Sequence, residues 1–176
     1  MARKMPFWHP VSLIISAGGV GFIPFAPGTF GSLIALPIAM VFFHAFNFPT
    51  PLIGALSGVA FSICIYFLGV KASAIYMQKT RTHDPSVIVI DEVAGQILAL
   101  SIISPLLWGG GLSPEYRWWV LGVNFALFRF FDIVKPWPVS FADKKMNNAH
   151  GVMLDDMFAG IYAGGLQFIA IYLFIL

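Results

Sequence analysis

Three pairs of charged residues each adjoin a long apolar run, in a chain of which only 10% of the residues are charged. The pairs are Asp91 with Glu92, Arg129 with Asp132, and Asp155 with Asp156. Ionisable side chains at membrane depth are costly unless they pair with one another or take part in a site. These pairs are therefore the first candidates for function.

The carboxylates of these pairs favour a hard cation that prefers oxygen ligands. Mg²⁺ is typically held by a few carboxylates together with water and substrate phosphate. The sole cysteine, Cys64, lies within an apolar run and the histidines show no ligand spacing, so a zinc site is disfavoured. The predicted metal ligands are Asp91, Glu92, Asp132, Asp155 and Asp156.

Each pair also has a purely structural interpretation. An acidic pair at a helix start is favoured by the helix dipole, which applies to both acidic pairs. Arg129 and Asp132 share a helical face, so they could form a simple ion pair, or Arg129 could bind a phosphate while Asp132 holds the metal. If Asp91 begins a helix, Gly95 lies on the same face and leaves room beside the carboxylate for a metal or a lipid head group.

The segment APGTFGSL, residues 26–33, adds a candidate phosphate site. Pro27 and Gly28 form a turn, and Thr29 or Ser32 would cap the helix that follows. A helix N-terminus presents free amides and a partial positive charge to a phosphate. The segment is not a Walker A loop, because Ser32 stands where that motif has lysine. The predicted substrate-binding residues are Thr29, Ser32, Arg129 and Lys135.

The amino-acid composition indicates that the chain is a membrane protein. Hydrophobic residues make up 59% of the 176 residues, and the mean hydropathy is +0.84, above what a soluble core needs. We predict an all-α, polytopic membrane helix bundle with about five spans, preceded by an interfacial or re-entrant element at residues 11–25. The predicted spans are Phe30 to Phe46, Leu52 to Val70, Val93 to Trp108, Trp118 to Val134 and Met157 to Leu176.

Basic residues in the short connections predict the orientation, because an excess of Lys and Arg marks the cytoplasmic side. The cytoplasmic set is Arg3, Lys4, Lys71, Lys79, Arg81, Lys135, Lys144 and Lys145. The count places the N-terminus inside and the C-terminus outside. All four polar clusters then lie at the cytoplasmic ends of their spans, so we expect them to converge on one face.

The remaining features of the sequence concern the number of domains and the kinds of binding partner. No linker or repeat divides the chain, so residues 1–176 are predicted to form a single domain. A net charge of +2 that is scattered along the sequence gives no indication of a nucleic-acid partner. The sequence is compatible with a homo-oligomer.

Four segments together resemble the phosphatidylglycerophosphatase A family of bacterial membrane phosphatases. They are APGTFGSL, IDEVAGQ, FRFFDIVKPWP and GVMLDDMFAG, beginning at residues 26, 90, 128 and 151. The resemblance implies a Mg²⁺-dependent phosphomonoesterase of the inner membrane, with its active site facing the cytoplasm, that hydrolyses phosphatidylglycerophosphate to phosphatidylglycerol and phosphate. Family members often carry a glycine pair where Asn148 and Ala149 stand here, so no role is carried over to His150.

On this hypothesis one or two Mg²⁺ ions would polarise the phosphate and activate a water. Direct attack by water is preferred to an aspartyl-phosphate intermediate, because the DxDx(T/V) pattern is missing. The predicted catalytic residues are Asp91, Glu92, Asp132 and Asp156, and the predicted partner is a phospholipid substrate in the membrane.

Other classes predict different patterns. A lipid phosphatase with a histidine nucleophile would show KxxxxxxRP and PSGH, and a CDP-alcohol phosphotransferase would show DGxxAR followed by GxxxDxxxD; neither set occurs. The alternative is a small ion-coupled membrane transporter whose carboxylates relay cations, which predicts carboxylates near mid-span.

Overall fold

The computed structural model describes residues 5–46, 48–82, 85–109, 112–146 and 148–174. These residues form α-helices, one 3-10 turn and no strand. The elements in chain order are α1 (Pro10–Ile15), η1 (Val20–Phe22), α2 (Pro27–Ala45), α3 (Pro51–Thr80), α4 (Ile90–Trp108), α5 (Pro114–Val134), α6 (Val139–Lys145) and α7 (Ala149–Phe174). The predicted all-α helix bundle is confirmed.

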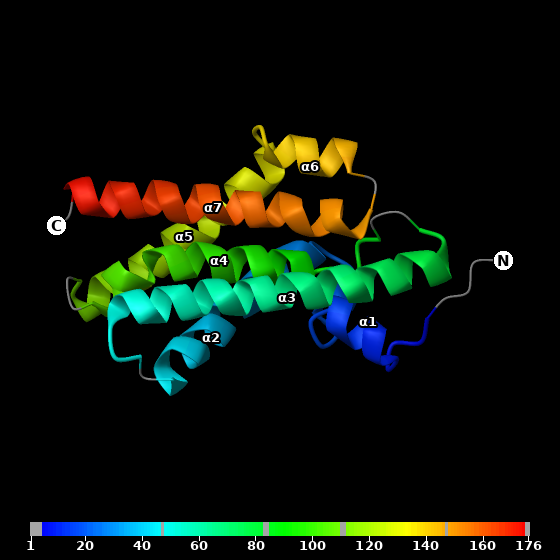
Figure 1. Ribbon diagram of the computed structural model, residues 1–176, viewed down its shortest axis with the longest axis horizontal. Coiled ribbons are helices and arrows are strands. Elements are labelled where there is room, and N and C mark those ends of the chain that lie inside the picture. The colour runs from blue at the N-terminus through cyan, green and yellow to red at the C-terminus, as the bar shows by residue number, and fades with distance from the viewer. Residues whose placement is uncertain (1–4, 47, 83–84, 110–111, 147, 175–176) are drawn as a thin grey trace.

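Helix α4 is the core of the bundle and lies between α3 and α7 (Figure 1). In its apolar stretch 78% of the residues are buried, against 22% in α2 and α3 and 33% in α7. These four helices are long and apolar enough to cross a membrane. The fourth predicted span, Trp118 to Val134, corresponds to α5, which does not meet that criterion, so its crossing stays a prediction. Helix α5 carries the charged residues Glu115, Arg117, Arg129 and Asp132.

Glycines let α4 and α7 approach closely. A Cβ atom at Gly95 would meet the carbonyl oxygen of Asp156, and one at Gly160 would meet the carbonyl oxygen of Gly95. One turn further on, a Cβ at Gly164 would lie 2.7 Å from the carbonyl oxygen of Ala99. Small residues at such positions allow van der Waals packing between backbones, which is how membrane helices associate. The expectation that Gly95 leaves room for a metal is therefore wrong, since helix α7 fills that space.

Helix α7 begins eight residues before the predicted span. The Asn148 Oδ1 atom accepts hydrogen bonds from the backbone N–H groups of His150 and Gly151, at 3.0 Å each, and so caps the helix. Asp155 and Asp156 consequently lie beyond the first turn of α7. Their interpretation as an acidic pair at a helix start is wrong, whereas Asp91 and Glu92 do lie in the first turn of α4.

The N-terminal element is not a continuous span, as predicted. Helix α1 packs against α3 and ends at Ile15. Three residues with positive φ angles, Ala17, Gly18 and Gly19, follow it. Its Ile15 carbonyl accepts a hydrogen bond of 2.8 Å from Val89 N, directly before α4. The element therefore fixes the start of the helix that carries Asp91. Arg3 and Lys4, counted for the orientation, lie outside the described residues, as do the last two residues of the fifth predicted span.

Polar side chains inside the bundle link three helices. The Gln96 side chain donates to Asn124 Oδ1 at 2.8 Å, and Asn124 donates to Gln167 Oε1 at 2.7 Å. Gln167 in turn donates to the carbonyl of Val120 at 2.7 Å. All three side chains are buried, so the network holds α4, α5 and α7 in a fixed register.

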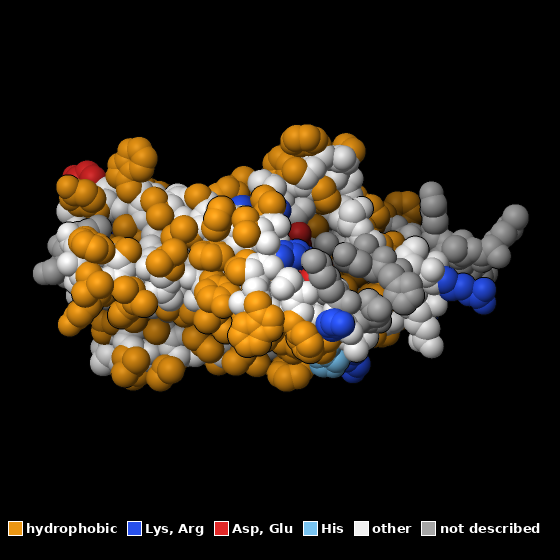
Figure 2. Space-filling model, turned by 90° about the horizontal axis from the view of Figure 1, so that it is seen from above, with side chains coloured by type: hydrophobic (Ala, Val, Ile, Leu, Met, Phe, Trp, Pro, Cys, Tyr) orange, Lys and Arg blue, Asp and Glu red, His pale blue; other side chains and the backbone are white. Residues whose placement is uncertain are grey.

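The surface divides along the long axis. Hydrophobic side chains cover most of the half that holds the C-terminal end of α7, and Lys and Arg side chains appear from the middle toward the N-terminal end (Figure 2). Exposed apolar residues on the long helices, such as Leu56, Phe67 and Ile169, are those expected to face lipid.

Candidate functional site

One cavity of about 290 Å³ collects the predicted clusters. Six of the seven Asp and Glu residues that the structure describes line it. They come from the first turn of α4, the last turn of α5, helix α6 and the second turn of α7, and the start of α2 contributes Pro27 and Gly28. The predicted convergence of four separate segments on one region is confirmed. The acidic residues are Asp91, Glu92, Asp132, Asp143, Asp155 and Asp156.

Three of these carboxylates form a compact group. One oxygen each from Asp91, Glu92 and Asp156 lies within 4.8 Å of the others. The Glu92 Oε2 and Asp156 Oδ1 atoms are buried and have no hydrogen-bond partner among the described residues. Buried carboxylate oxygens without a partner are expensive. The donor set, three carboxylates on two rigid helices, is the kind that Mg²⁺ uses.

Asp132 faces the same cavity but is held by Arg129. The Arg129 Nη1 atom lies 2.7 Å from Asp132 Oδ2 and donates to Ser32 Oγ at 3.2 Å. Ser32 itself donates to the Gly28 carbonyl at 2.9 Å. Arg129 and Ser32 are not among the residues that line the cavity. Arg129 therefore ties the end of α5 to the start of α2, and its binding to a phosphate stays a prediction.

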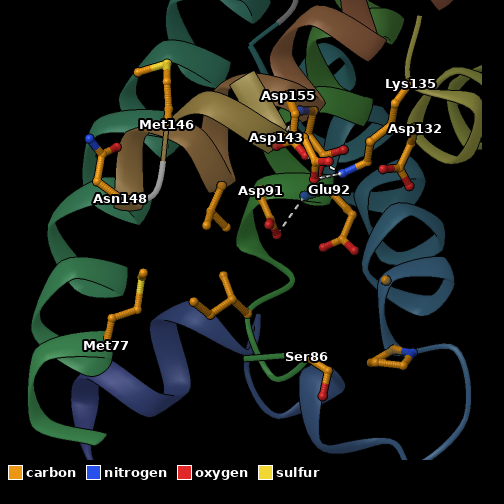
Figure 3. A pocket seen from close by; sticks show the side chains of 15 residues that line it. Met77, Ser86, Asp91, Glu92, Asp132, Lys135, Asp143, Met146, Asn148 and Asp155 are labelled. Carbon is orange, nitrogen blue, oxygen red and sulfur yellow. Dashed lines mark hydrogen bonds and ion pairs between the residues drawn. The ribbon is translucent and has the colours of Figure 1, made fainter. Parts of the chain in front are cut away.

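Lys135 is the basic residue that lines the cavity. Its Nζ donates to Asp155 Oδ2 at 2.7 Å and to Asp143 Oδ1 at 2.5 Å, and Figure 3 shows these three side chains meeting on one side of the cavity. Burial by itself lowers the pKa of Lys135, but the two carboxylates outweigh it and raise the pKa above its usual range. The ammonium is therefore charged at any physiological pH.

The start of α2 differs from the predicted cap. Its N-cap residue is Ala26, which forms no side-chain cap. Thr29 lies inside the helix and does not line the cavity, and Ser32 bonds back to the preceding turn. The prediction that Thr29 or Ser32 caps the helix is wrong, because Pro27 already opens it. Their binding of substrate stays a prediction.

Comparison with known proteins identifies the family. The family model for phosphatidylglycerophosphatase A matches residues 13–171. The chain belongs to this family. A phosphatidylglycerophosphatase A of Haemophilus influenzae is 34% identical over 92% of the chain and 88% of its own length, and that of Escherichia coli is 31% identical over 92% and 81%. No solved structure matches the chain.

A third relative bears on the head group. A protein of Bacteroides thetaiotaomicron named "Putative phosphatidylinositol-3-phosphatase" is 38% identical over 91% of the chain and 92% of its own length. The names of the three relatives agree on removal of a phosphate from a phospholipid and differ in the alcohol that carries it. As a member of the phosphatidylglycerophosphatase A family, the protein is a phosphatase.

Sequence reasoning missed Asp143 in this phosphatase. The residue lies in FADKK, outside every apolar run, and its acidic neighbours were found because they adjoin such runs. The small number of acidic residues is the signal that could have found it, since among those that the structure describes only Glu115 does not line the cavity. His150 does not line the cavity; its Nδ1 atom lies 2.8 Å from the Tyr66 hydroxyl.

We expect a Gly28→Ala variant of the phosphatase to lose at least about tenfold in kcat/KM. The added Cβ would meet the Glu92 carboxylate and lie 3.5 Å from Arg129 Nη1, so it displaces a group of the acidic cluster, and a small misplacement costs catalysis heavily. Alanine favours helix, so the melting temperature should not fall.

The matched control is Gly122→Ala in α5, where an added Cβ meets nothing within 4 Å. Phosphate-release kinetics and melting curves are measured on the same preparations of both variants, so that an effect on catalysis is distinguished from an effect on stability. A Gly28→Ala enzyme with the kinetics of Gly122→Ala would show that Glu92 can move freely without loss of function.

Proposed function

We propose that the protein hydrolyses the phosphomonoester of phosphatidylglycerophosphate, with Mg²⁺, to give phosphatidylglycerol and phosphate. The observation that carries the proposal is the charge of the cavity, where six carboxylates face one lysine among the described side chains. A phosphate dianion cannot enter such a cavity unless a cation neutralises part of that charge. Membership of the family supplies the substrate class.

The described residues fit a bound Mg²⁺ ion. Asp91, Glu92 and Asp156 would hold it, since one oxygen of each lies within 4.8 Å of the others. The buried Glu92 Oε2 and Asp156 Oδ1 atoms have no hydrogen-bond partner among the residues that the structure describes. Asp132 and Asp155 line the same cavity and would contribute through their Oδ1 atoms, while their Oδ2 atoms stay paired with Arg129 and Lys135, respectively. A metal ion in this position supplies charge neutralisation to the phosphate and activates water for attack.

The protein's own groups then divide the remaining work. Lys135 donates a hydrogen bond to a non-bridging phosphate oxygen, which offsets the negative charge of the bound phosphate. Arg129 holds Asp132 and the start of α2 in place through Ser32. The apolar wall, which includes Met77 and Met146 on the side of the cavity away from Lys135 (Figure 3), receives the less polar part of the lipid head.

The position of the carboxylates favours hydrolysis over ion transport. Asp91 and Glu92 lie in the first turn of α4, and Asp132 lies in the last turn of α5. A cation relay across the membrane would need ionisable groups near mid-span, where the described part of the bundle has the neutral Gln96, Asn124 and Gln167.

The substrate assignment is tested by phosphate release from purified protein with Mg²⁺. The substrates are phosphatidylglycerophosphate and phosphatidylinositol 3-phosphate, presented in the same detergent micelles. We expect a kcat/KM for phosphatidylglycerophosphate at least about tenfold higher, which corresponds to a difference of 1.4 kcal/mol in transition-state binding. Release from the inositol lipid alone, or from neither lipid, would reject the assignment.

We further propose that the protein lies in the bacterial inner membrane with the cavity on the cytoplasmic side, as the basic residues predict. A cysteine replacing Lys79, at the cavity end of α3, should react with an impermeant maleimide only after the membrane is opened. One replacing Ser113, at the other end of the bundle, should react in intact spheroplasts. Reaction of the Lys79 variant in intact spheroplasts would reverse the orientation. Cys64 is replaced by alanine in both variants.

A further inference from the structure

Lys135 is held by carboxylates from two different helices. Asp155 belongs to α7 and Asp143 to α6, and both accept hydrogen bonds from the same ammonium group. An ammonium group has three N–H donors in a tetrahedral arrangement. Two of them are fixed by these carboxylates, so the direction of the third is fixed as well. Because Lys135 lines the cavity, that donor remains for a ligand bound there.

Helix α6 is itself firmly attached, which gives Asp143 a defined position. Val139 and Ala142 are fully buried, and the helix packs along α7 (Figure 1). The Tyr162 hydroxyl donates to the Trp137 carbonyl at 2.8 Å, just before α6. The short helix therefore brings Asp143 to Lys135 from a rigid support.

The backbone of Lys135 also depends on its partners. Lys135 ends α5 with a φ angle of 47°, a left-handed conformation that is unfavourable for a residue with a side chain. Such a conformation persists where surrounding contacts impose it. The contacts to Asp143 and Asp155 are two that hold this residue.

We propose that Asp143 is a positioning residue, which orients the Lys135 ammonium so that its third N–H points at the substrate phosphate. The inference rests on the proposed function and deepens it, since it adds α6 to the machinery of the site. Asp143 acts through Lys135 and does not itself touch the phosphate.

The experiment compares Asp143→Asn with the wild-type protein in phosphate release from phosphatidylglycerophosphate. The amide keeps the size of the side chain and removes its charge. We expect KM to rise about tenfold, the amount typical of a charged hydrogen bond, while kcat changes less than threefold, because Lys135 binds phosphate in the ground state and the transition state alike. A fall in KM would show that Asp143 competes with the substrate for Lys135, and it would overturn the proposal.

Two further variants serve as controls. Asp143→Glu restores the charge and should bring KM to within about threefold of the wild-type value. Glu115→Gln removes one negative charge at the far end of the bundle, where Glu115 accepts a hydrogen bond from Ser113, and should leave both constants unchanged. Equal KM values for Asp143→Asn and Asp143→Glu would contradict the positioning role.

A double-mutant cycle with Lys135→Met decides whether Asp143 acts through Lys135. The rise in melting temperature produced by inorganic phosphate with Mg²⁺ is measured for the wild type, both single variants and the double variant. We expect Asp143→Asn to reduce the rise in the wild-type background and to change nothing in the Lys135→Met background. Equal reductions in both backgrounds would overturn the inference. A wild-type protein that responds to phosphate but releases none from the lipid would reject the proposed function alone.

Discussion

Replacement of Asp156 by asparagine is expected to lower kcat for phosphate release about a thousand-fold, since a metal site contributes several kcal/mol to the transition state and each 1.36 kcal/mol is a factor of ten. Asp156 is 3% exposed, and its Oδ1 atom has no hydrogen-bond partner in the described part of the chain. It lies with Asp91 and Glu92 in the group that is close enough to share one ion. The variant loses one of the three carboxylates of this group.

The Asp156→Asn substitution, although it lowers activity, is not expected to lower the stability of the metal-free protein. Without metal, three carboxylates repel one another, so Asp156→Asn should melt no lower than the wild type. With Mg²⁺ the wild type should gain melting temperature through binding to the folded state, and the variant should not. Glu115→Gln is the control for loss of one charge. An Asp156→Asn protein that keeps full activity, or that gains as much from Mg²⁺ as the wild type, would remove this residue from the metal site.

Replacement of Gly160 by leucine is expected to destabilise the fold by about 3 kcal/mol or more, at the upper end of overpacking effects. The new side chain would meet the carbonyl oxygen of Gly95, a backbone atom that cannot turn away. Helices α4 and α7 would have to separate, which also parts Asp91 and Glu92 from Asp156. The loss appears as a lower melting temperature in detergent together with lost phosphate release.

The control for this prediction lies five residues further along the same helix. A Cβ at Gly165 meets nothing within 4 Å, so Gly165→Leu should keep the melting temperature and the activity. If both variants behave alike, the close contact between α4 and α7 is not what holds the two halves of the acidic cluster together.

The convergence of the clusters was predictable because two independent signals agree. The apolar runs give the helices, and the Lys and Arg count gives their direction, so Asp91 and Asp156 were placed at the same end before any contact was known. The start of α7 was not predictable from the apolar run. That run begins at Met157, whereas the helix begins where the Asn148 side chain caps it, and a capping residue inside a polar loop gives only a weak signal.

Only one of the ion pairs within the site could be predicted from the sequence. Arg129 and Asp132 are close in the chain, and their ion pair follows from helical spacing. The contact between Lys135 and Asp143 depends on how α6 folds back along α7, and Gly95 reveals its role only when the opposite backbone of α7 is in place. Both the Lys135–Asp143 contact and the role of Gly95 depend on tertiary packing between helices.

The central claim, that the acidic cluster holds Mg²⁺ for phosphomonoester hydrolysis, is tested most directly by phosphate release from phosphatidylglycerophosphate after metal removal. Purified protein is treated with EDTA, passed into chelator-free buffer and assayed before and after addition of Mg²⁺. Because the candidate ligands are carboxylates, we predict that activity is lost on treatment and returns with Mg²⁺ in the wild type, but not in the Asp156→Asn variant. Undiminished release from the EDTA-treated wild-type protein would contradict the account.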